Sequence, residues 1–175
     1  MIGLGIGINR KLPIITPSFF KKFGTPAAAY SLRDLSGSNP NVIEVRRSSD
    51  NAVQDFTSSE ITDGSLATWV GAGNDGFVRT WYNQGSLSSR DALQTTASLQ
   101  PLIVEQGVLV VDNGLPAVKG NGAQQIPFTY TEFTNDFTFL SVQNGVGFLY
   151  GSASAGGSDY LRYNGTTRMD MDGSV

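Results

Sequence analysis

Short runs of β-branched and aromatic residues, each followed by a cluster of Gly, Asn, Asp or Ser, recur along this 175-residue sequence. Such runs favour strands, because branched and aromatic side chains pack well on a pleated surface. The clusters favour tight turns, since Gly adopts positive φ without strain and Asn, Asp and Ser bond their own backbone. With 21 glycines and only 15% charged residues, the composition does not suit a helical bundle. We therefore expect an all-β fold.

The spacing of these runs predicts an antiparallel β-sandwich, of the concanavalin-A-like or jelly-roll kind. We expect strands at residues 29–32, 42–46, 77–82, 102–104, 108–111, 137–142, 147–150, 159–163 and 168–171. Turns are expected at residues 105–107, at residues 112–114 and at Asn164-Gly165. One short helix is expected at residues 65–70, with Asp63 at its start and Gly71 after its end.

The first 26 residues differ from the rest of the chain. Pro13, Pro17 and Pro26 interrupt them, so we expect neither a continuous strand nor a continuous helix. Burying a large apolar side chain stabilises a protein by ~1.5–3 kcal/mol. A tail that stays in water does not gain this free energy. We therefore predict an extended arm, residues 1–26, that docks against another chain or particle; an unstructured terminus is the alternative. The anchoring side chains would be Leu4, Ile6, Ile8, Ile14, Ile15, Phe19 and Phe20.

The sandwich is expected to occupy residues 27–175. Residues 172–175 are a turn signal that directly follows a predicted strand. Strands do not normally stop in an unfinished hairpin, and an open sheet edge is usually covered. We expect either a sandwich that is incomplete at its C-terminus or a neighbouring subunit on the open edge.

Missing residue types exclude several classes of function. The sequence has no cysteine and no histidine, which excludes disulfides, Cys nucleophiles, Ser-His-Asp arrangements and most zinc chemistry. The net charge of −3 argues against nucleic-acid binding, and no apolar run reaches the ~18 residues of a membrane span. We expect no cofactor and no metal, and the lack of cysteine fits synthesis in a reducing cytoplasm.

Three segments, taken in order, resemble a known family. They are residues 29–56 with the run Arg47-Ser48-Ser49-Asp50-Asn51, residues 80–92 with Thr80-Trp81-Tyr82-Asn83-Gln84, and residues 100–118 with Asn113-Gly114-Leu115-Pro116. This series resembles the concanavalin-A-like sandwich module shared by phage structural proteins and B-type α-L-arabinofuranosidases. The likeness is best over residues 27–125. The family usually has Asp where this chain has Asn83, and the turn at residues 85–89 has diverged.

The resemblance leaves two functions to compare. Retaining glycosidases need two carboxyls about 5–5.5 Å apart. In the enzyme branch the nucleophile is the glutamate of an Asp-x-Glu segment, and the nearest match here, Asp170-Met171-Asp172, has an aspartate in that place. The family's acid/base lies further downstream than Val175. We therefore expect no glycoside hydrolase activity from this chain.

The expected function is that of a phage virion protein (a spike, fibre or decoration protein), made in the host cytoplasm and located in the virion. Residues 1–26 would bind other virion proteins, and the chain would form a homo-oligomer, a trimer by analogy with fibres. A host surface glycan is the expected ligand of the sandwich. A carbohydrate-active enzyme or carbohydrate-binding module is the alternative, and a bacterial adhesin module is the third hypothesis.

Arg46, Arg47, Asp50 and Asp55 form the first group of candidate site residues. Arginine binds planar acids bidentately, so these residues suit a ligand clamp. The alternative is a structural network in which Arg47, Asp50 and Asp55 hold two strands together. Because enzymes and non-enzymes of the family share the motif, the structural role is favoured.

Trp81 and Tyr82 are consecutive residues of a predicted strand, so their side chains face opposite ways and at least one, Trp81 by default, belongs to the core. Asp170 and Asp172 are two residues apart on another strand and share a face. With Tyr150 they are candidates for glycan binding, and as oxygen ligands they also suit Ca²⁺. The alternative is a pair of solvated acids.

Overall fold

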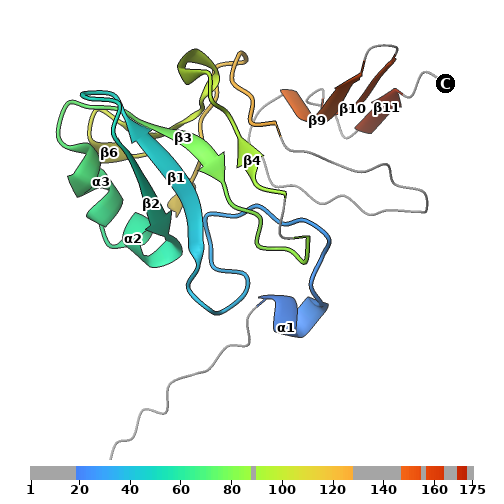
Figure 1. Cartoon of the computed structure of the whole chain (residues 1–175), viewed down its shortest axis with the longest axis horizontal. Coiled ribbons are helices and arrows are strands. Elements are labelled where there is room, and N and C mark those ends of the chain that lie inside the picture. The colour runs from blue at the N-terminus through green and yellow to red at the C-terminus, as the bar shows by residue number, and fades with distance from the viewer. Residues whose placement is uncertain (1–18, 88–89, 128–146, 155–156, 164–168, 173–175) are drawn as a thin grey trace, which may run out of the picture.

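The structure, a computed structural model, describes residues 19–87, 90–127, 147–154, 157–163 and 169–172 (Figure 1). Its elements are α1 (Phe19–Phe23), β1 (Asn41–Arg47), β2 (Val53–Thr57), α2 (Ser58–Thr62), α3 (Ser65–Val70), β3 (Gly76–Trp81), β4 (Ala92–Leu93), the 3₁₀ turn η1 (Ala97–Leu99), β5 (Leu102–Glu105), β6 (Val108–Leu109), β7 (Val111–Asp112), β8 (Leu115–Pro116), β9 (Gly147–Ser154), β10 (Gly157–Tyr163) and β11 (Met169–Asp172).

A six-stranded antiparallel sheet forms the centre of the described structure. Its strand order is β2-β1-β3-β5-β6, and β4 also pairs with β3. The sheet curls into half of a barrel (Figure 1). Irregular register between β1 and both of its neighbours contributes to the curl, because a bulge increases local twist. The expected mostly β, antiparallel fold is therefore confirmed.

The apolar face of this sheet packs against two short helices. Ile61 of α2 and Leu66 of α3 are buried in the same core as Val45 of β1. The cluster consists of Leu32, Val42, Ile43, Val45, Phe56, Ile61, Leu66, Val70, Val78, Ile103 and Val104. Short helices rather than strands thus supply part of the layer opposite β1 and β3.

Neither a sandwich nor a jelly roll is formed by the residues that the structure describes. Besides the six-stranded sheet they form only the two-stranded β7-β8 hairpin and a three-stranded sheet with the order β11-β10-β9. The expectation of two packed sheets followed from counting strand-like runs. The runs at β6, β7 and β8 yield only two strand residues each, so within the described residues they do not form a second layer.

The expectation of a single helix was wrong, although its position was right. Helix α3 covers Ser65–Val70 as predicted, and α1 and α2 are additional. A capping box starts α2: the Thr57 hydroxyl accepts from the Glu60 backbone N–H, and the Glu60 carboxylate accepts from the Thr57 N–H at 2.8 Å. Thr57-Ser58-Ser59-Glu60 carries this signal in the sequence, although the sequence analysis predicted no helix there.

Asp63 lies one residue before the N-cap of α3, instead of being the N-cap itself. The N-cap is Gly64, with φ of +93°, and no side chain caps the helix there. The Asp63 carboxylate instead accepts from the Ser65 backbone N–H at 2.9 Å. Gly71 follows the helix as predicted, but with φ of +84° and ψ of 153° it lies outside the expected left-handed helical region, in another positive-φ conformation that glycine adopts readily.

Two predicted turns are confirmed. Gln106 and Gly107 both have positive φ between β5 and β6, and Asn113 and Gly114 both have positive φ between β7 and β8. Two consecutive residues with positive φ are the signature of the tight hairpin turn that matches strand twist. The sequence signals for both hairpins were local, which is why they could be read correctly.

The predicted strand at residues 29–32 is not formed. This segment runs as an irregular stretch whose backbone groups bond to side chains instead of a neighbouring strand. The predicted extended arm is also interrupted, because Phe19–Phe23 form the short helix α1. Anchoring residues 4–15 lie outside the described residues.

The strands β9, β10 and β11 form a separate antiparallel sheet. The expected pairing of the last two strands is confirmed: Tyr160 is opposite Asp172, and Arg162 is opposite Asp170. The expected strand at residues 147–150 is present as part of β9, whereas the one at 137–142 lies outside the described residues.

Candidate functional site

Arg47 and Asp50 form a bidentate ion pair at the end of β1. The Arg47 Nε and Nη2 donate to the two Asp50 oxygens at 2.9 and 2.6 Å, and this bond holds the pKa of Asp50 down at about 2. Arg47 Nη1 donates to the Trp69 carbonyl at 2.8 Å, and the guanidinium lies over the Trp69 ring. Arg47 therefore joins the turn after β1 to the end of α3.

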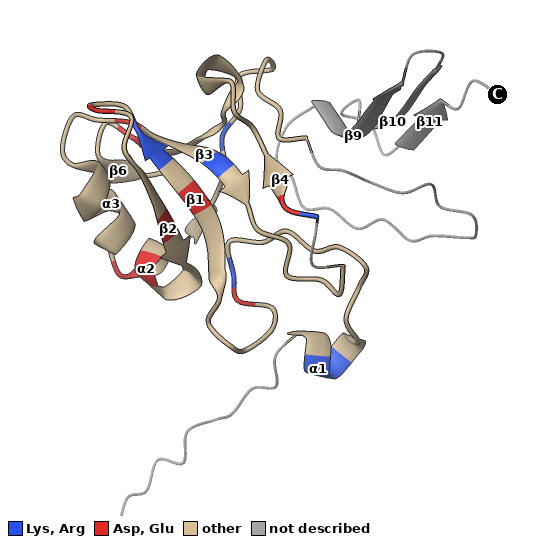
Figure 2. Ribbon diagram, viewed as in Figure 1, with Lys and Arg blue, Asp and Glu red and all other residues tan. Residues whose placement is uncertain are grey.

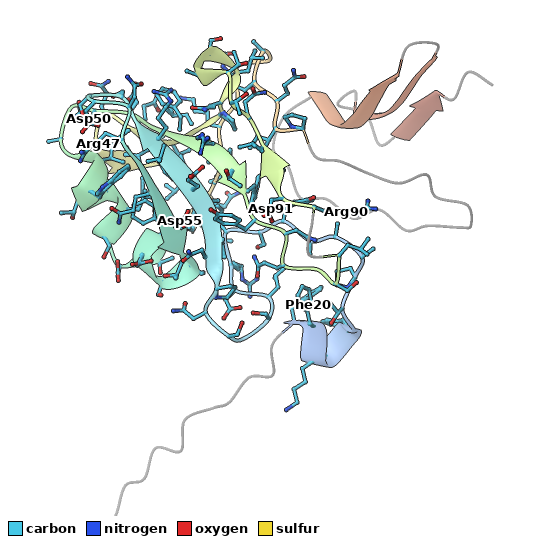
Figure 3. All side chains as sticks on the ribbon, in the orientation of Figure 1. Phe20, Arg47, Asp50, Asp55, Arg90 and Asp91 are labelled. Atoms are coloured by element: carbon cyan, nitrogen blue, oxygen red, sulfur yellow. The ribbon has the colours of Figure 1, made fainter. Side chains whose placement is uncertain are left out.

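Asp55 lies away from that pair, in the middle of β2 (Figure 3). Its carboxylate accepts from the Tyr82 hydroxyl at 2.7 Å and from the Asn41 amide at 3.3 Å. Burial, and then the bond to Asp55, raise the pKa of Tyr82 far above its usual value. The expected single network of Arg47, Asp50 and Asp55 is thus replaced by two separate ones, because Asp55 lies along β2 while Asp50 lies in the turn before it.

Arg46 projects from the face of β1 opposite the core and is part of a third network. Its Nε donates to the Gln100 side chain at 2.7 Å and its Nη1 donates to Asn51 at 2.9 Å. The guanidinium lies 4.8 Å from the centroid of the Phe77 ring on β3. These contacts fix the planar cation at one orientation and leave part of it exposed.

Glu44 lies next to Arg46 along the same face of β1. One of its oxygens accepts from Arg79 at 2.6 Å and from the Thr80 hydroxyl at 2.8 Å. The Glu44 and Arg79 side chains are 16% and 35% exposed, so the pair is only partly screened by solvent. Sequence analysis did not select Glu44 or Arg79; their opposite charges on neighbouring strands were the available signal.

Cross-strand pairing places these groups on one surface. Glu44 is opposite Asp55, and Arg46 is opposite Phe77; directly opposed residues share a face of a sheet. We call this surface, made of Glu44, Arg46, Asp55, Phe77 and Tyr82, the polar face. It combines hydrogen-bonding groups held in place with an aromatic ring, which suits a polar ligand such as a sugar.

Trp81 faces the other way from Tyr82, as strand alternation requires. It packs against the core cluster, and the Tyr30 ring meets it edge to face with centroids 6.5 Å apart. The Tyr30 hydroxyl donates to the Arg90 carbonyl, and burial followed by the charge of Asp91 raises the pKa of Tyr30 to about 12. The Trp81 indole N–H is buried and has no hydrogen-bond partner within the described residues.

Asn83 and Gln84 follow β3 after Tyr82. Their side chains bind residues 29–35, the irregular segment that precedes β1. The Asn83 amide oxygen accepts from the Ala29 and Gly85 backbone N–H groups, both at 2.8 Å. The Asn83 amide nitrogen donates to the Leu87 carbonyl at 2.7 Å. We call Asn83 and Gln84 the clasp.

The Gln84 side chain makes three hydrogen bonds to the same segment. Its oxygen accepts from the Leu35 N–H at 2.8 Å, and its nitrogen donates to the carbonyls of Ser31 and Arg33. The clasp explains why residues 29–32 form no strand. In the sequence, Asn83 and Gln84 are notable only as part of the resemblance to a family, and nothing local indicates their partners.

Backbone contact strengthens the clasp. The Ser86 and Leu87 N–H groups donate to the carbonyls of Pro26 and Ala27 at 2.9 and 3.1 Å. A Cβ on Gly85 would come within 2.8 Å of the backbone of residues 26–28. Only glycine permits so close an approach.

Helix α1 lies just before the segment held by the clasp. The Phe20 N–H donates to the Leu35 carbonyl at 3.2 Å, which ties the helix to the body of the protein. The Phe19 and Phe23 rings contact each other at a tilt of 44°, with centroids 4.9 Å apart, and these residues are 44% and 64% exposed. Of the predicted anchoring residues, only Phe19 and Phe20 are described.

Asp170 and Asp172 lie on β11, and Tyr150 lies on β9. The backbone places both aspartates on the same face of β11, as expected for residues two apart in a strand. Their proposed roles in glycan or Ca²⁺ binding stay predictions. Among the residues that the structure describes, no group of three or more acidic side chains is arranged to hold a metal ion.

No helix within the described ranges is long and apolar enough to cross a membrane. The chain matches no family model, no curated protein and no solved structure.

Proposed function

We propose that this chain is a phage virion structural protein (a spike, fibre or decoration protein) that is anchored by its N-terminal segment and presents a lectin-like β module. In this proposal the curled sheet is one layer of the sandwich predicted from the sequence. The chain resides in the virion, is a homo-oligomer and has no catalytic activity of its own.

The arrangement around α1 carries this proposal. Phe19 and Phe23 present a contacting pair of aromatic rings to solvent, and the bond from Phe20 to Leu35 together with the clasp fixes α1 to the body. Exposed aromatic rings on a rigidly held element suit a docking contact, because little conformational freedom is lost on binding. The six large aliphatic residues from Leu4 to Ile15 extend the apolar character of this end of the chain.

The test is to purify particles from cells that express the gene and to locate the chain on them by immunogold electron microscopy. We expect the label on the particle surface, and loss of the label when Ile6 and Ile8 are both changed to Asp. Val53→Asp, at a valine that is 46% exposed on β2, is the matched control and should leave the label in place. Particles that carry none of the wild-type chain would refute the proposal.

Glycan binding by the polar face is a second candidate function, and one observation favours it. Arg46 is held beside the Phe77 ring, and the bond between Tyr82 and Asp55 fixes those two side chains elsewhere on the same face. A glycan array probed with the full chain should show binding that Arg46→Ala weakens. The same array with Asp172→Ala tests the site predicted on β11, and an array without any bound glycan would remove both sites from consideration.

A further inference from the structure

Among the arginines of β1 and β3, Arg46 alone has no carboxylate partner within the described residues. Arg47 is paired with Asp50, and Arg79 is paired with Glu44. Figure 2 shows the basic end of β1, the acidic position that precedes it on the strand, and the basic position of β3 beside that acidic one. Arg46 donates instead to neutral amide oxygens. In this part of the chain its positive charge is therefore not offset by an ion pair.

Buried amide side chains hold the Arg46 guanidinium in place. The side-chain oxygen of Gln100, a residue that is only 2% exposed, accepts from Arg46 Nε at 2.7 Å. The Gln100 amide nitrogen donates to the Gln94 carbonyl at 2.8 Å, and the buried Gln94 side chain donates to the Gln125 carbonyl at 2.9 Å. Turning Arg46 away would leave a buried oxygen unpaired, which is costly. The cation is therefore pre-organised.

The outer edge of the Arg46 guanidinium is open to a ligand. Each terminal nitrogen of an arginine carries two protons, and Nη1 donates to Asn51 while Nη2 makes no bond within the described residues. The only buried side-chain polar atom left unpaired in those residues is the Trp81 indole nitrogen, so Arg46 Nη2 reaches solvent. Nη1 and Nη2 together match the two oxygens of a carboxylate. Burial lowers the pKa of Arg46, and a bound anion would offset the loss of hydration that causes this.

Apolar side chains flank Arg46 on both neighbouring strands. Val53 of β2 and Phe77 of β3 are its cross-strand partners, so the three side chains share one face. Val53 is 46% exposed, and the Phe77 ring lies beside the guanidinium. A charge among apolar groups attracts an anion more strongly than a charge in open water does, because the effective dielectric constant is lower. The exposed valine also gives the C–H groups of a ligand a surface to pack on.

Glu44 adds a hydrogen-bond acceptor to the same face. Arg79 and the Thr80 hydroxyl both donate to Glu44 Oε2, whereas Oε1 makes no bond within the described ranges and, like Arg46 Nη2, reaches solvent. Glu44 and Arg46 are two residues apart on β1, about 6.6 Å along the strand. Substituents on opposite sides of one sugar ring span a similar distance. Because Arg79 offsets the charge of Glu44, an anion can approach Arg46.

We propose that Arg46 binds the carboxylate of an acidic sugar, such as a uronic or sialic acid unit of a host surface glycan. Arg46 Nη1 and Nη2 donate to the carboxylate, the sugar ring packs over Val53, and Glu44 Oε1 accepts from one of the sugar hydroxyls. A ligand with single carboxylates is favoured over a densely sulfated chain, because the net charge of −3 repels polyanions. This inference rests on the glycan binding proposed above as the second candidate function, and it names the class of glycan.

The first experiment probes an array of carboxylated, sulfated and neutral glycans with the full chain. We expect binding to the carboxylated glycans, weakened by added salt because the attraction is between charges. Methyl glucuronide and methyl glucoside, which share a ring and differ at the carboxylate, are then titrated into the full chain in solution and followed by NMR. Methyl glucuronide should bind at least about tenfold more tightly, because only it forms bonds between charged groups.

Val53→Asp and Val53→Asn form a matched pair of variants. The aspartate would place a carboxylate opposite Arg46 and occupy the guanidinium from within the chain, whereas the asparagine has the same shape without the charge. Val53 is exposed on β2, so both variants should fold, which thermal unfolding checks. Val53→Asp should weaken binding of methyl glucuronide at least about tenfold, and Val53→Asn less than about threefold. Arg46→Ala should also abolish binding, but it leaves the buried Gln100 oxygen unpaired and so lowers stability.

The outcomes separate this inference from the proposed functions. Binding to neutral glycans that Arg46→Ala weakens would overturn the inference and leave glycan binding by the polar face in place. Binding to sulfated glycans alone, or binding of methyl glucuronide that Val53→Asp leaves unchanged, would also overturn it. An array without bound glycan would overturn both, and a glutamate-rich peptide that binds instead would assign Arg46 to an acidic protein partner. Labelled particles would still support the virion role in each of these cases.

Discussion

The side-chain oxygen of Gln84 accepts a hydrogen bond from the backbone N–H of Leu35 at 2.8 Å, although the two residues are 49 positions apart in the sequence. This bond and the two that the Gln84 nitrogen donates add side-chain contacts to the few backbone bonds that hold residues 26–35. A large part of the stability of this end of the domain should therefore depend on the Gln84 amide.

Replacing Gln84 with Ala should lower the free energy of unfolding by about 2–3 kcal/mol, because three hydrogen bonds are lost and half-buried backbone groups are left unpaired. Urea titration of the full chain measures the change. Gln54→Ala, at an exposed glutamine of β2, should change the free energy by less than about 0.5 kcal/mol. Equal effects of the two substitutions would show that the clasp is not important for stability.

Asn83→Asp should destabilise the protein by about 1–2 kcal/mol, because an oxygen would replace the amide nitrogen that donates to the Leu87 carbonyl. The other oxygen would still accept from Ala29 and Gly85, so the loss should be smaller than for Asn83→Ala. Thermal unfolding of both variants tests the order. A stabilised Asp variant would mean that the residue usual in the resembling family also suits this chain.

Gly107→Ala and Gly114→Ala separate backbone strain from steric clash. Both glycines have positive φ, but only at Gly107 would a Cβ meet backbone, at 2.7 Å from the Cα of Ala72. We expect a loss of about 1–2 kcal/mol for Gly114→Ala from the left-handed conformation alone. Gly107→Ala should cost more than about 3 kcal/mol, because neighbouring backbone must move. Chemical denaturation measures both, and similar losses would contradict the close approach of β6 to α3.

The Arg47–Asp50 pair predicts a pH dependence at the acid end of the scale. The pKa of Asp50 is about 2 in the folded protein, against ~3.9 in an unfolded chain. A depressed folded pKa means that the contribution of Asp50 is complete above the unfolded value and is lost as the pH falls from about 4 to about 2. Carbon-detected NMR titration of the Asp50 carboxyl checks the pKa. Asp50→Asn should remove this part of the pH dependence, and an unchanged acid profile would argue against the pair.

Local signals account for the parts of the fold that the sequence predicted correctly. Gln106-Gly107 and Asn113-Gly114 provide two adjacent residues that tolerate positive φ, which is sufficient to define a tight hairpin. Helix α3 was found because Gly71 ends a short apolar stretch. The capping box of Thr57 and Glu60 was an equally local signal, and a search for capping patterns would have found α2.

The sites were less predictable, because their partners come from distant parts of the chain. Arg47 and Asp50 are only three positions apart, and their pairing could be anticipated. The Asp55–Tyr82 bond joins positions 27 apart, and the Arg46–Gln100 bond joins positions 54 apart. Which carboxylate an arginine or a tyrosine meets depends on strand order and register, and neither is encoded near those residues.

The sequence by itself determined many of the strands and the two hairpin turns at Gln106-Gly107 and Asn113-Gly114, because backbone preferences act over two to four neighbouring positions. It also determined that histidine and cysteine chemistry is absent. Tertiary structure alone decided that helices cover part of the core, that Asn83 and Gln84 hold residues 29–35, and that Glu44, Arg46 and Asp55 share one face. The physical reason is that these contacts form only when strand pairing brings residues dozens of positions apart within hydrogen-bond distance.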